Sequence, residues 1–379
     1  MKIWQEISIE NLQFNLNQIR QKVGKNVDVL AVIKANAYGH GADIIAPALE
    51  AAGVNFFGAA GIEEAIALRD IGIKSNILLM GPLLEYELNE IINNNVIPTL
   101  SDKKTAENIK IILDRENKKI KIHVKIDTGM GRFGIYYKDA LDFIEFVSRQ
   151  KCFEINGIYS HFSSADFDSK ETEKQLNIFL SILRGLEEKE IYIPYKHIAN
   201  SSAIINLENS YFNMVRSGLL LYGISPIKNS AYLQGLELRP VMQWKTRLVF
   251  KKNIPGNHGV SYGQSYITPQ KQNIGIIPVG YKHGLDRNLS NKGFVLIKGK
   301  QAPIIGAITM DYTIINLSDI PLSKIGDEVV IIGSQEDNKI SVEQLSAKTG
   351  RLPYEVLCNI SDKIEKLAIK NRTEIIYHG

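Results

Sequence analysis

The sequence predicts an α/β protein, with an N-terminal TIM (β/α)8 barrel followed by a mainly β C-terminal domain. Three observations predict this. Up to about residue 225, short β-branched runs alternate with longer amphipathic segments. The strand-like runs number eight, which is the strand count of a TIM barrel. From Val241 onward, strand-like runs follow one another without helices between them. We expect the barrel over residues 1–235 and the β domain over 236–379.

The eight barrel strands are predicted from near-continuous apolar runs, as a parallel sheet buried on both faces requires. In order they are 29–35, 56–60, 76–80, 96–100, 122–126, 155–161, 195–200 and 213–221. Between most of them, apolar residues spaced three and four apart predict helices, for example over 61–73 and 138–150. A doubly wound open sheet is the alternative arrangement of the same units.

The second domain is predicted from strand-like runs that no longer alternate with helices. These runs are 241–252, 273–281, 294–300, 302–317 and 327–333, and short helical signals follow at 341–350 and 353–361.

Composition restricts the class of protein. With 379 residues, a formal net charge of +4 and 44% apolar residues, the chain is expected to bind neither nucleic acid nor membrane. Glu6 and Glu10 lie where a signal peptide needs an apolar run. Cys152 and Cys358 lack the spacing of a disulfide framework or a zinc site. We therefore expect a cytoplasmic protein without a bound metal.

Five polar residues fall at or near the carboxyl ends of the predicted barrel strands, where TIM barrels assemble active sites. They are Lys34, Arg132, His161, Ser201 and Arg216. Taken singly, each has an ordinary explanation, because strand-end lysines usually extend to water and lone histidines are usually satisfied core groups. All five at one rim indicate a site.

This set of groups suits one kind of chemistry. A lysine in a partly apolar pocket near other cations becomes a nucleophile that can form a Schiff base. The groups suited to a phosphate-bearing cofactor and a carboxylate substrate are Arg132, Arg216, Tyr38, Ser201 and the backbone of Gly218. Pyridoxal 5'-phosphate meets these requirements.

Residues 31–41, AVIKANAYGHG, closely resemble the pyridoxal-phosphate attachment motif of the alanine racemase family. The resemblance continues through KIDTGMGRFG, SHFSSAD, HIANSSA, VRSGLLLYG, GVSYGQSY, PVGYKHG, ITMD and LPYEVLCNIS, in the family's order and over almost the whole chain. It implies a barrel, a β domain that the first residues of the chain often join, and a homodimer whose active sites are shared between subunits.

The resemblance also implies individual roles. Lys34 would hold the cofactor as an internal aldimine and serve as one catalytic base, and Tyr262 from the partner subunit would serve as the other. The cofactor would also contact Tyr38, His161, Ser201, Arg216, Gly218, Leu219 and Tyr354. Arg132 and Met310 would bind the substrate carboxylate. Supporting positions and those lining the path to the site would be Lys125, Asp166, Tyr281, Arg287 and Asp311. The lysine matching Lys125 is carbamylated in many members.

Two bases are needed because racemisation removes an α-proton from one face of the substrate carbon and returns one to the other. Each well-placed base typically contributes about 10² to 10⁴ in rate. Arg216 would face the pyridine nitrogen, and because arginine stays protonated, that nitrogen would remain unprotonated. The ring is then a weaker electron sink, which disfavours transamination. The leading hypothesis is interconversion of L- and D-alanine for peptidoglycan precursors.

Some features leave alternatives open. GMGRFG at 129–134 fits the G-x-G-x-x-G pattern, but it lies in the fifth β/α unit, so dinucleotide binding is disfavoured. The chain departs from the family's usual pattern at Ser217, Lys282, His283 and Thr309. Lys282 and His283 alter the charge expected along the path to the site.

Thr309 borders the expected substrate pocket, which keeps a serine or broad-specificity racemase as one alternative. A non-catalytic pyridoxal-phosphate-binding protein is an alternative of another class. That alternative predicts neither the β domain nor Tyr262, and this sequence has both.

Overall fold

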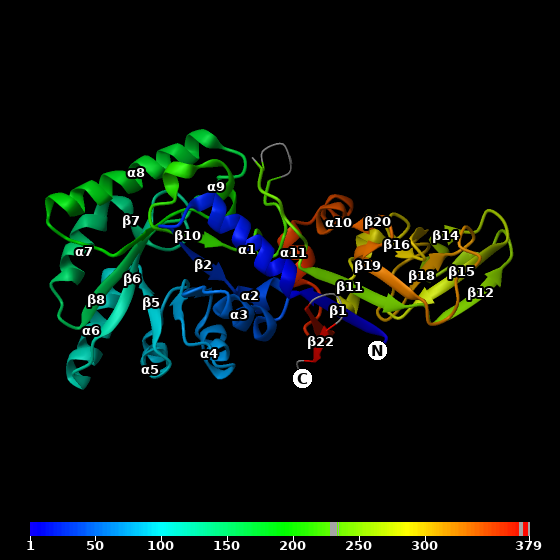
Figure 1. The fold of residues 1–379 in the computed structure, drawn as a ribbon, viewed down its shortest axis with the longest axis horizontal. Helices are drawn as coiled ribbons and strands as arrows, with labels where there is room; N and C mark the ends of the chain where they lie inside the picture. The colour runs from blue at the N-terminus through cyan, green and yellow to red at the C-terminus, as the bar shows by residue number, and fades with distance from the viewer. Residues whose placement is uncertain (228–232, 234, 371–373, 378–379) are drawn as a thin grey trace.

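The N-terminal part of the chain forms the predicted barrel, as the computed structural model in Figure 1 shows. The structure describes residues 1–227, 233, 235–370 and 374–377. The eight parallel barrel strands are β2 (Asp28–Val32), β3 (Phe56–Ala59), β4 (Asn76–Leu79), β5 (Val96–Leu100), β6 (Ile120–Asp127), β8 (Phe153–Tyr159), β9 (Tyr195–His197) and β10 (Met214–Ser217).

Hydrogen-bonded neighbours run in the order β10, β2, β3, β4, β5, β6, β8 and β9, and the short β7 (Ile135–Tyr136) pairs with β6. Arg216 N–H in β10 donates to Ala199 O, just beyond β9, at 2.9 Å. The two end strands therefore meet, and the barrel is nearly closed. The predicted fold class is confirmed, and the open-sheet alternative is wrong.

Helices surround the barrel strands. They are α1 (Ile9–Val23), α3 (Ala42–Ala51), α4 (Ile62–Asp70), α5 (Leu88–Asn93), α6 (Lys103–Glu116), α7 (Ala140–Ser148), α8 (Ser169–Glu188) and α9 (Ser201–Asn206), whereas α2 (Lys34–Tyr38) is a short left-handed turn after β2. Every residue of β3 and β5 is buried, because barrel side chains on one face and helices on the other cover both sides of the sheet. None of the described helices is long and apolar enough to cross a membrane.

The first strand, β1 (Ile3–Ser8), lies in the sheet of the second domain. It pairs antiparallel with β11 (Met242–Arg247) and parallel with β21 (Glu365–Lys370). Ser8 then caps α1 by accepting a hydrogen bond from the Asn11 N–H. One hydrophobic cluster contains buried residues of both domains, so the two domains pack against each other where the chain passes from one to the other.

The second domain is mainly β. Its remaining elements are β12 (Phe250–Ile254), β13 (Gly259–Val260), β14 (Tyr266–Ile267), β15 (Gln272–Ile277), β16 (Phe294–Ile297), β17 (Lys300–Pro303), β18 (Thr313–Asn316), β19 (Glu328–Gln335), β20 (Asn338–Ile340), β22 (Glu374–Tyr377), α10 (Val342–Thr349) and α11 (Pro353–Cys358). The prediction of strand throughout 302–317 is wrong, because a loop separates β17 from β18. Gly306 in that loop has a φ of +75°, which favours glycine and interrupts a strand.

Candidate functional site

A cavity of about 460 Å³ lies at the carboxyl ends of the barrel strands. It brings together residues that are far apart in the sequence, as expected for this face of a TIM barrel. The predicted site residues that line it are Lys34, Tyr38, Lys125, Arg132, His161, Ser201, Arg216, Gly218, Leu219 and Tyr354.

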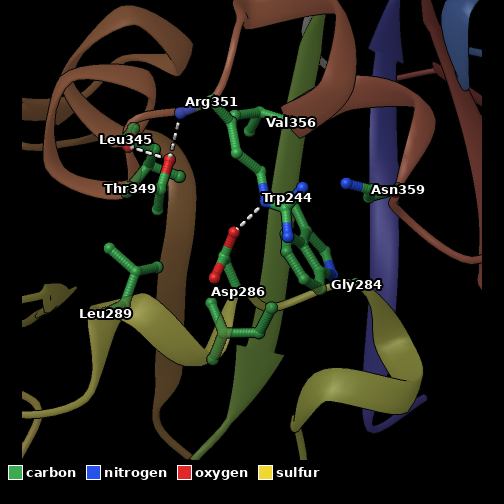
Figure 2. Close-up of a pocket in the computed structure, with 10 residues that line it drawn as sticks. Trp244, Gly284, Asp286, Leu289, Leu345, Thr349, Arg351, Val356 and Asn359 are labelled. Atoms are coloured by element: carbon green, nitrogen blue, oxygen red, sulfur yellow. Dashed lines mark hydrogen bonds and ion pairs between the residues drawn. The ribbon is translucent and has the colours of Figure 1, made fainter.

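A second cavity lies in the β domain, between Trp244, Asp286 and Arg351 (Figure 2). Its volume is about 20 Å³, which is enough for about one water molecule. An ion pair between Arg351 and Asp286 closes one side. This cavity is too small for a substrate or cofactor, so the barrel cavity is the candidate functional site.

Lys34 stands at the start of a strained turn. Strand β2 ends two residues before it, and residues 35–38 all have φ between 50° and 54°. Successive left-handed residues cost about 1–2 kcal/mol each, and such strain persists only where the surroundings enforce it. The buried His40 ring does so, because its Nδ1 lies 3.0 Å from the carbonyl oxygens of both Ala37 and Tyr38.

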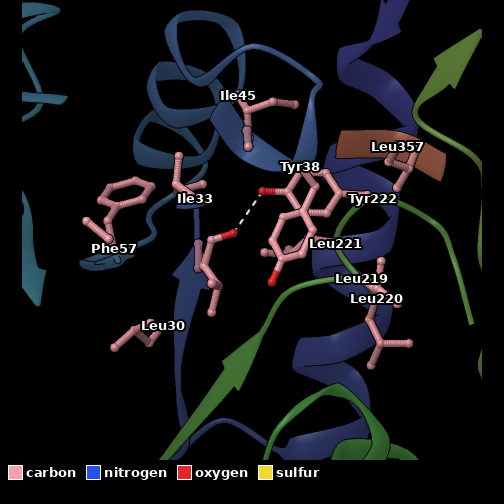
Figure 3. Packing of buried hydrophobic residues seen from close by; sticks show 14 of the residues in the cluster. Leu30, Ile33, Tyr38, Ile45, Phe57, Leu219, Leu220, Leu221, Tyr222 and Leu357 are labelled. Carbon is pink, nitrogen blue, oxygen red and sulfur yellow. Dashed lines mark hydrogen bonds between the residues drawn. The ribbon is translucent and has the colours of Figure 1, made fainter. Parts of the chain in front are cut away.

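The β domain packs against this turn through α11. The Tyr38 ring lies close to those of Tyr222 and Tyr354, with centroid distances of 5.1 and 6.0 Å, and Figure 3 shows it beside Tyr222. A Cβ at Gly39 would come within 2.7 Å of Leu357 O. The close approach of α11 therefore requires glycine at this position.

Two lysines in the cavity, Lys34 and Lys125, form no ion pair with a carboxylate of the described residues. Burial lowers the pKa of Lys34, and the Arg132 charge lowers it further. Burial, followed by the charges of Arg216 and Arg132, lowers the pKa of Lys125 to about 7. Lys125 Nζ lies 3.3 Å from the ring centroid of Phe133, and Lys125 has no ion pair with a described residue. Both amines are therefore shifted towards the neutral, nucleophilic form.

The Arg216 guanidinium is buried and held on several sides. Its Nη1 donates to His197 Nδ1 at 2.9 Å and to His197 O at 3.2 Å. Its Nη2 donates to the carbonyl oxygens of Ser160 (2.6 Å) and Ile198 (3.1 Å), and His161 Nδ1 lies 3.3 Å away. Burial lowers the Arg216 pKa to about 10, so the group stays protonated at neutral pH.

Backbone and hydroxyl groups form another part of the wall. Gly218 N–H donates to Ser201 Oγ at 3.0 Å. A Cβ added at Gly218 would lie 2.8 Å from the Tyr38 hydroxyl oxygen. The three residues thus form a cradle of N–H and O–H groups that only glycine leaves open at position 218.

Six predicted site residues do not line the cavity of this chain: Asp166, Tyr262, Tyr281, Arg287, Met310 and Asp311. Asp166 lies near the cavity, since its charge adds to the effect of burial in raising the Tyr354 pKa. Tyr262 and Met310 are 76% and 53% exposed.

The exposed groups of the β domain are joined by loop contacts. Ser261 Oγ, next to Tyr262, donates to Ala307 O at 2.6 Å in the loop that carries Met310. Lys282 forms an ion pair with Asp311 in the same loop, so the unusual lysine does not add an unbalanced charge there.

Sequence reasoning missed His197 and His123. His197 is the main side-chain partner of Arg216, and His123 lies behind it. The usable signal was the alternation of side chains along β6, where His123 and Lys125 are two residues apart and so face the same side of the barrel wall. No comparable signal marks His197.

Comparisons with known proteins match both domains of the chain. The family model described as "Alanine racemase, N-terminal domain" matches residues 7–226, and "Alanine racemase, C-terminal domain" matches 241–368. An alanine racemase of Halothermothrix orenii is 39% identical over 364 residues, which cover 96% of each chain.

Solved structures show the same fold. An alanine racemase of Clostridium difficile 630 has a TM-score of 0.93 and 34% identity over 99% of this chain and 97% of its own. A Bartonella henselae alanine racemase, described with covalently bound pyridoxal phosphate, has a TM-score of 0.87 and 29% identity over 97% of this chain and 100% of its own.

Proposed function

This chain belongs to the alanine racemase family, and on that premise we propose that it interconverts L- and D-alanine with pyridoxal 5'-phosphate as cofactor. The observation that carries the proposal is the convergence of Lys34, Arg216 and Arg132 on one cavity, where none of them forms an ion pair with a carboxylate of the described residues. A cytoplasmic location and the supply of D-alanine for peptidoglycan are part of the same proposal.

The residues present fit this cofactor. The cavity of about 460 Å³ has room for it, and the Tyr38, Ser201 and Gly218 cradle offers donors to a phosphate. Lys34 would hold the aldehyde carbon, and Arg216 would face the pyridine nitrogen. When bound, the cofactor supplies an electron sink that acidifies the α-proton of the amino acid attached to it.

This chain's own groups would then move the proton. Lys34 Nζ, with its pKa lowered by burial, would accept or return the α-proton on one face of the substrate carbon. Arg132 would hold the substrate carboxylate in the orientation that presents that face. The neutral His161 ring beside Arg216 would help keep water out of the site.

A second base must act on the opposite face, and the family pattern assigns this role to Tyr262, which does not line the cavity of its own chain. Its 76% exposure supports a homodimer in which the partner's cavity receives it. Exposed Met310, on the neighbouring loop, would enter the same cavity to meet the substrate carboxylate. Exposed aromatic and apolar groups of this kind are typical of subunit interfaces.

Lys125 would be carbamylated. Its pKa of about 7 leaves a large share of neutral amine at physiological pH, which can add to carbon dioxide with loss of a proton. The resulting carbamate anion would pair with Arg132, whose charge lies close enough to lower the Lys125 pKa. This would orient Arg132 without help from any carboxylate side chain.

The test is a racemisation assay of cofactor-loaded protein with L-alanine and L-serine in parallel, following each D-enantiomer by chiral chromatography. We expect D-alanine to form at least about tenfold faster than D-serine. Comparable or faster serine turnover would assign a serine or broad-specificity racemase. No turnover of either amino acid, with cofactor bound, would assign a non-catalytic binding protein.

Tyr262→Phe is the matched variant for the mechanism. It removes one hydroxyl group from an exposed side chain, so folding and cofactor absorbance should be retained. We expect alanine racemisation to fall by about 10² to 10⁴, the usual contribution of one base. Wild-type activity in this variant would contradict the role of Tyr262.

A further inference from the structure

Two buried histidines extend the contacts of Arg216 across the barrel interior. His197 Nδ1 lies 2.9 Å from Arg216 Nη1, and His197 Nε2 lies 3.0 Å from His123 Nδ1. The histidines are fully buried and Arg216 is 4% exposed. The three side chains come from β6, β9 and β10, so the chain of contacts spans three strands.

The barrel makes room for this chain of contacts at β8, which lies between β6 and β9 in the sheet. A Cβ at Gly157 in β8 would lie 2.4 to 2.6 Å from three atoms of the His123 ring. Only glycine at position 157 therefore allows the His123 imidazole to reach His197.

The donors and acceptors fix which nitrogens carry protons. Arginine can only donate, so His197 Nδ1 must accept from Arg216. The proton of the neutral His197 ring is then on Nε2 and is donated to His123 Nδ1, which must also be an acceptor. Burial lowers the pKa of both histidines, that of His123 to about 4, which keeps both rings neutral.

Stacking alone cannot set this pattern. The His197 ring lies parallel to that of Tyr159, with centroids 4.8 Å apart and an interplanar angle of 3°. The Tyr159 hydroxyl is in turn hydrogen-bonded to Thr99 at 2.8 Å. These contacts fix the plane of the His197 ring, but not which nitrogen carries the proton. Arg216 requires a free Nδ1, and His123 supplies the acceptor for the proton that is left on Nε2.

We propose that His123 is a positioning residue for Arg216: by accepting the His197 Nε2 proton, it keeps His197 Nδ1 free to hold the guanidinium in place at the cavity wall. The inference rests on the proposed function, in which Arg216 faces the pyridine nitrogen. Without His123, His197 either buries an unpaired N–H or turns a second donor towards Arg216.

The first test is ¹⁵N–¹H NMR of the holoenzyme labelled at histidine side chains, with signals assigned by single substitutions. We expect His123 and His197 both to be neutral and protonated at Nε2 around neutral pH. A His197 ring protonated at Nδ1, or doubly protonated, would overturn the proposal. This readout does not depend on activity.

The second test compares His123→Leu, which removes the acceptor, with His123→Asn, whose side-chain oxygen can take the place of Nδ1. Phe56→Leu is the packing control, because Phe56 lies against His123 with centroids 6.3 Å apart but belongs to no hydrogen bond of the chain of contacts. Cofactor binding and the thermal midpoint are measured for all three.

The decisive readout is the number of racemisation turnovers completed before the cofactor is lost to transamination, in which the substrate's amino group stays on the cofactor and a keto acid leaves. We expect this number to fall by up to about tenfold in His123→Leu, the upper end of the effect of losing a hydrogen bond between neutral groups. It should recover in His123→Asn and stay at the wild-type value in Phe56→Leu.

The outcomes separate the two proposals. An unchanged number in His123→Leu, or an equal fall in Phe56→Leu, overturns the role of His123 while leaving the racemase intact. If the wild-type protein does not racemise alanine, the proposed function fails, and the NMR experiment still decides whether His123 sets the His197 tautomer.

Discussion

Replacement of Lys125 by methionine should stabilise the unmodified protein at neutral pH. The side chain is only 4% exposed and lies near the charges of Arg216 and Arg132. Its pKa is about 7 in the folded chain, against 10.5 ordinarily. Between these values the unfolded chain binds more protons, so the free energy of unfolding rises with pH across that window and is lowest at its acidic end.

The magnitude follows from the width of this window. At about 1.4 kcal/mol per pKa unit, the destabilisation at pH 7 is at most about 4 kcal/mol. Because Lys125 borders a cavity that water can fill, we expect about half of this, about 2 kcal/mol. Lys125→Met, similar in volume but uncharged, should recover that amount at neutral pH and gain much less at about pH 10, close to the ordinary lysine pKa of 10.5.

The assay is urea unfolding of both proteins from about pH 7 to pH 10 in buffer free of carbon dioxide. Slopes from other groups cancel in the difference between the proteins. Bicarbonate should then stabilise the wild-type protein alone, because a carbamate replaces the buried cation by an anion near Arg132. Parallel pH profiles, or a methionine variant that is less stable at pH 7, would refute the reasoning.

Three further predictions concern stability. Ser217→Ala should raise the free energy of unfolding by about 1 kcal/mol in urea titrations, because the buried Ser217 hydroxyl has no hydrogen-bond partner among the described residues; a loss of stability would reveal a partner. As pH falls from 6.5 to 4, the free energy of unfolding should drop by up to about 1.4 kcal/mol per pH unit for each of His40 and His123, because their folded pKa values are about 4. A urea midpoint that stays constant over that range would be inconsistent with neutral buried rings. Ala35, with a φ of +51°, should tolerate glycine within about 1 kcal/mol but lose more than about 1 kcal/mol as valine; equal thermal midpoints for the two variants would contradict the strain.

Much of the candidate site could be predicted because its residues lie at the carboxyl ends of barrel strands. Lys34 and Arg216 were found from the sequence, since polar residues at the carboxyl ends of barrel strands must converge. The left-handed turn after Lys34 was not, because local propensity does not favour four successive positive φ values at non-glycine residues; the contacts of the buried His40 ring enforce them.

Other features depend on contacts that a single sequence does not encode locally. His123 and His197 come from strands separated by β8, and their hydrogen bond becomes visible only when the barrel closes. The loop between β17 and β18 was taken for strand because its apolar residues are nearly continuous, whereas Gly306 and the turn at Thr309, whose Oγ1 bonds to Tyr312, interrupt it.

The most direct test of the account is a mixed dimer of Lys34→Ala and Tyr262→Phe subunits, each inactive by itself. If every site combines Lys34 of one subunit with Tyr262 of its partner, a mixed dimer contains one intact site. Random exchange makes about half of the dimers mixed, so about a quarter of the wild-type alanine racemase activity should return. No recovered activity, with subunit exchange verified by differential tagging, would contradict a site shared between subunits.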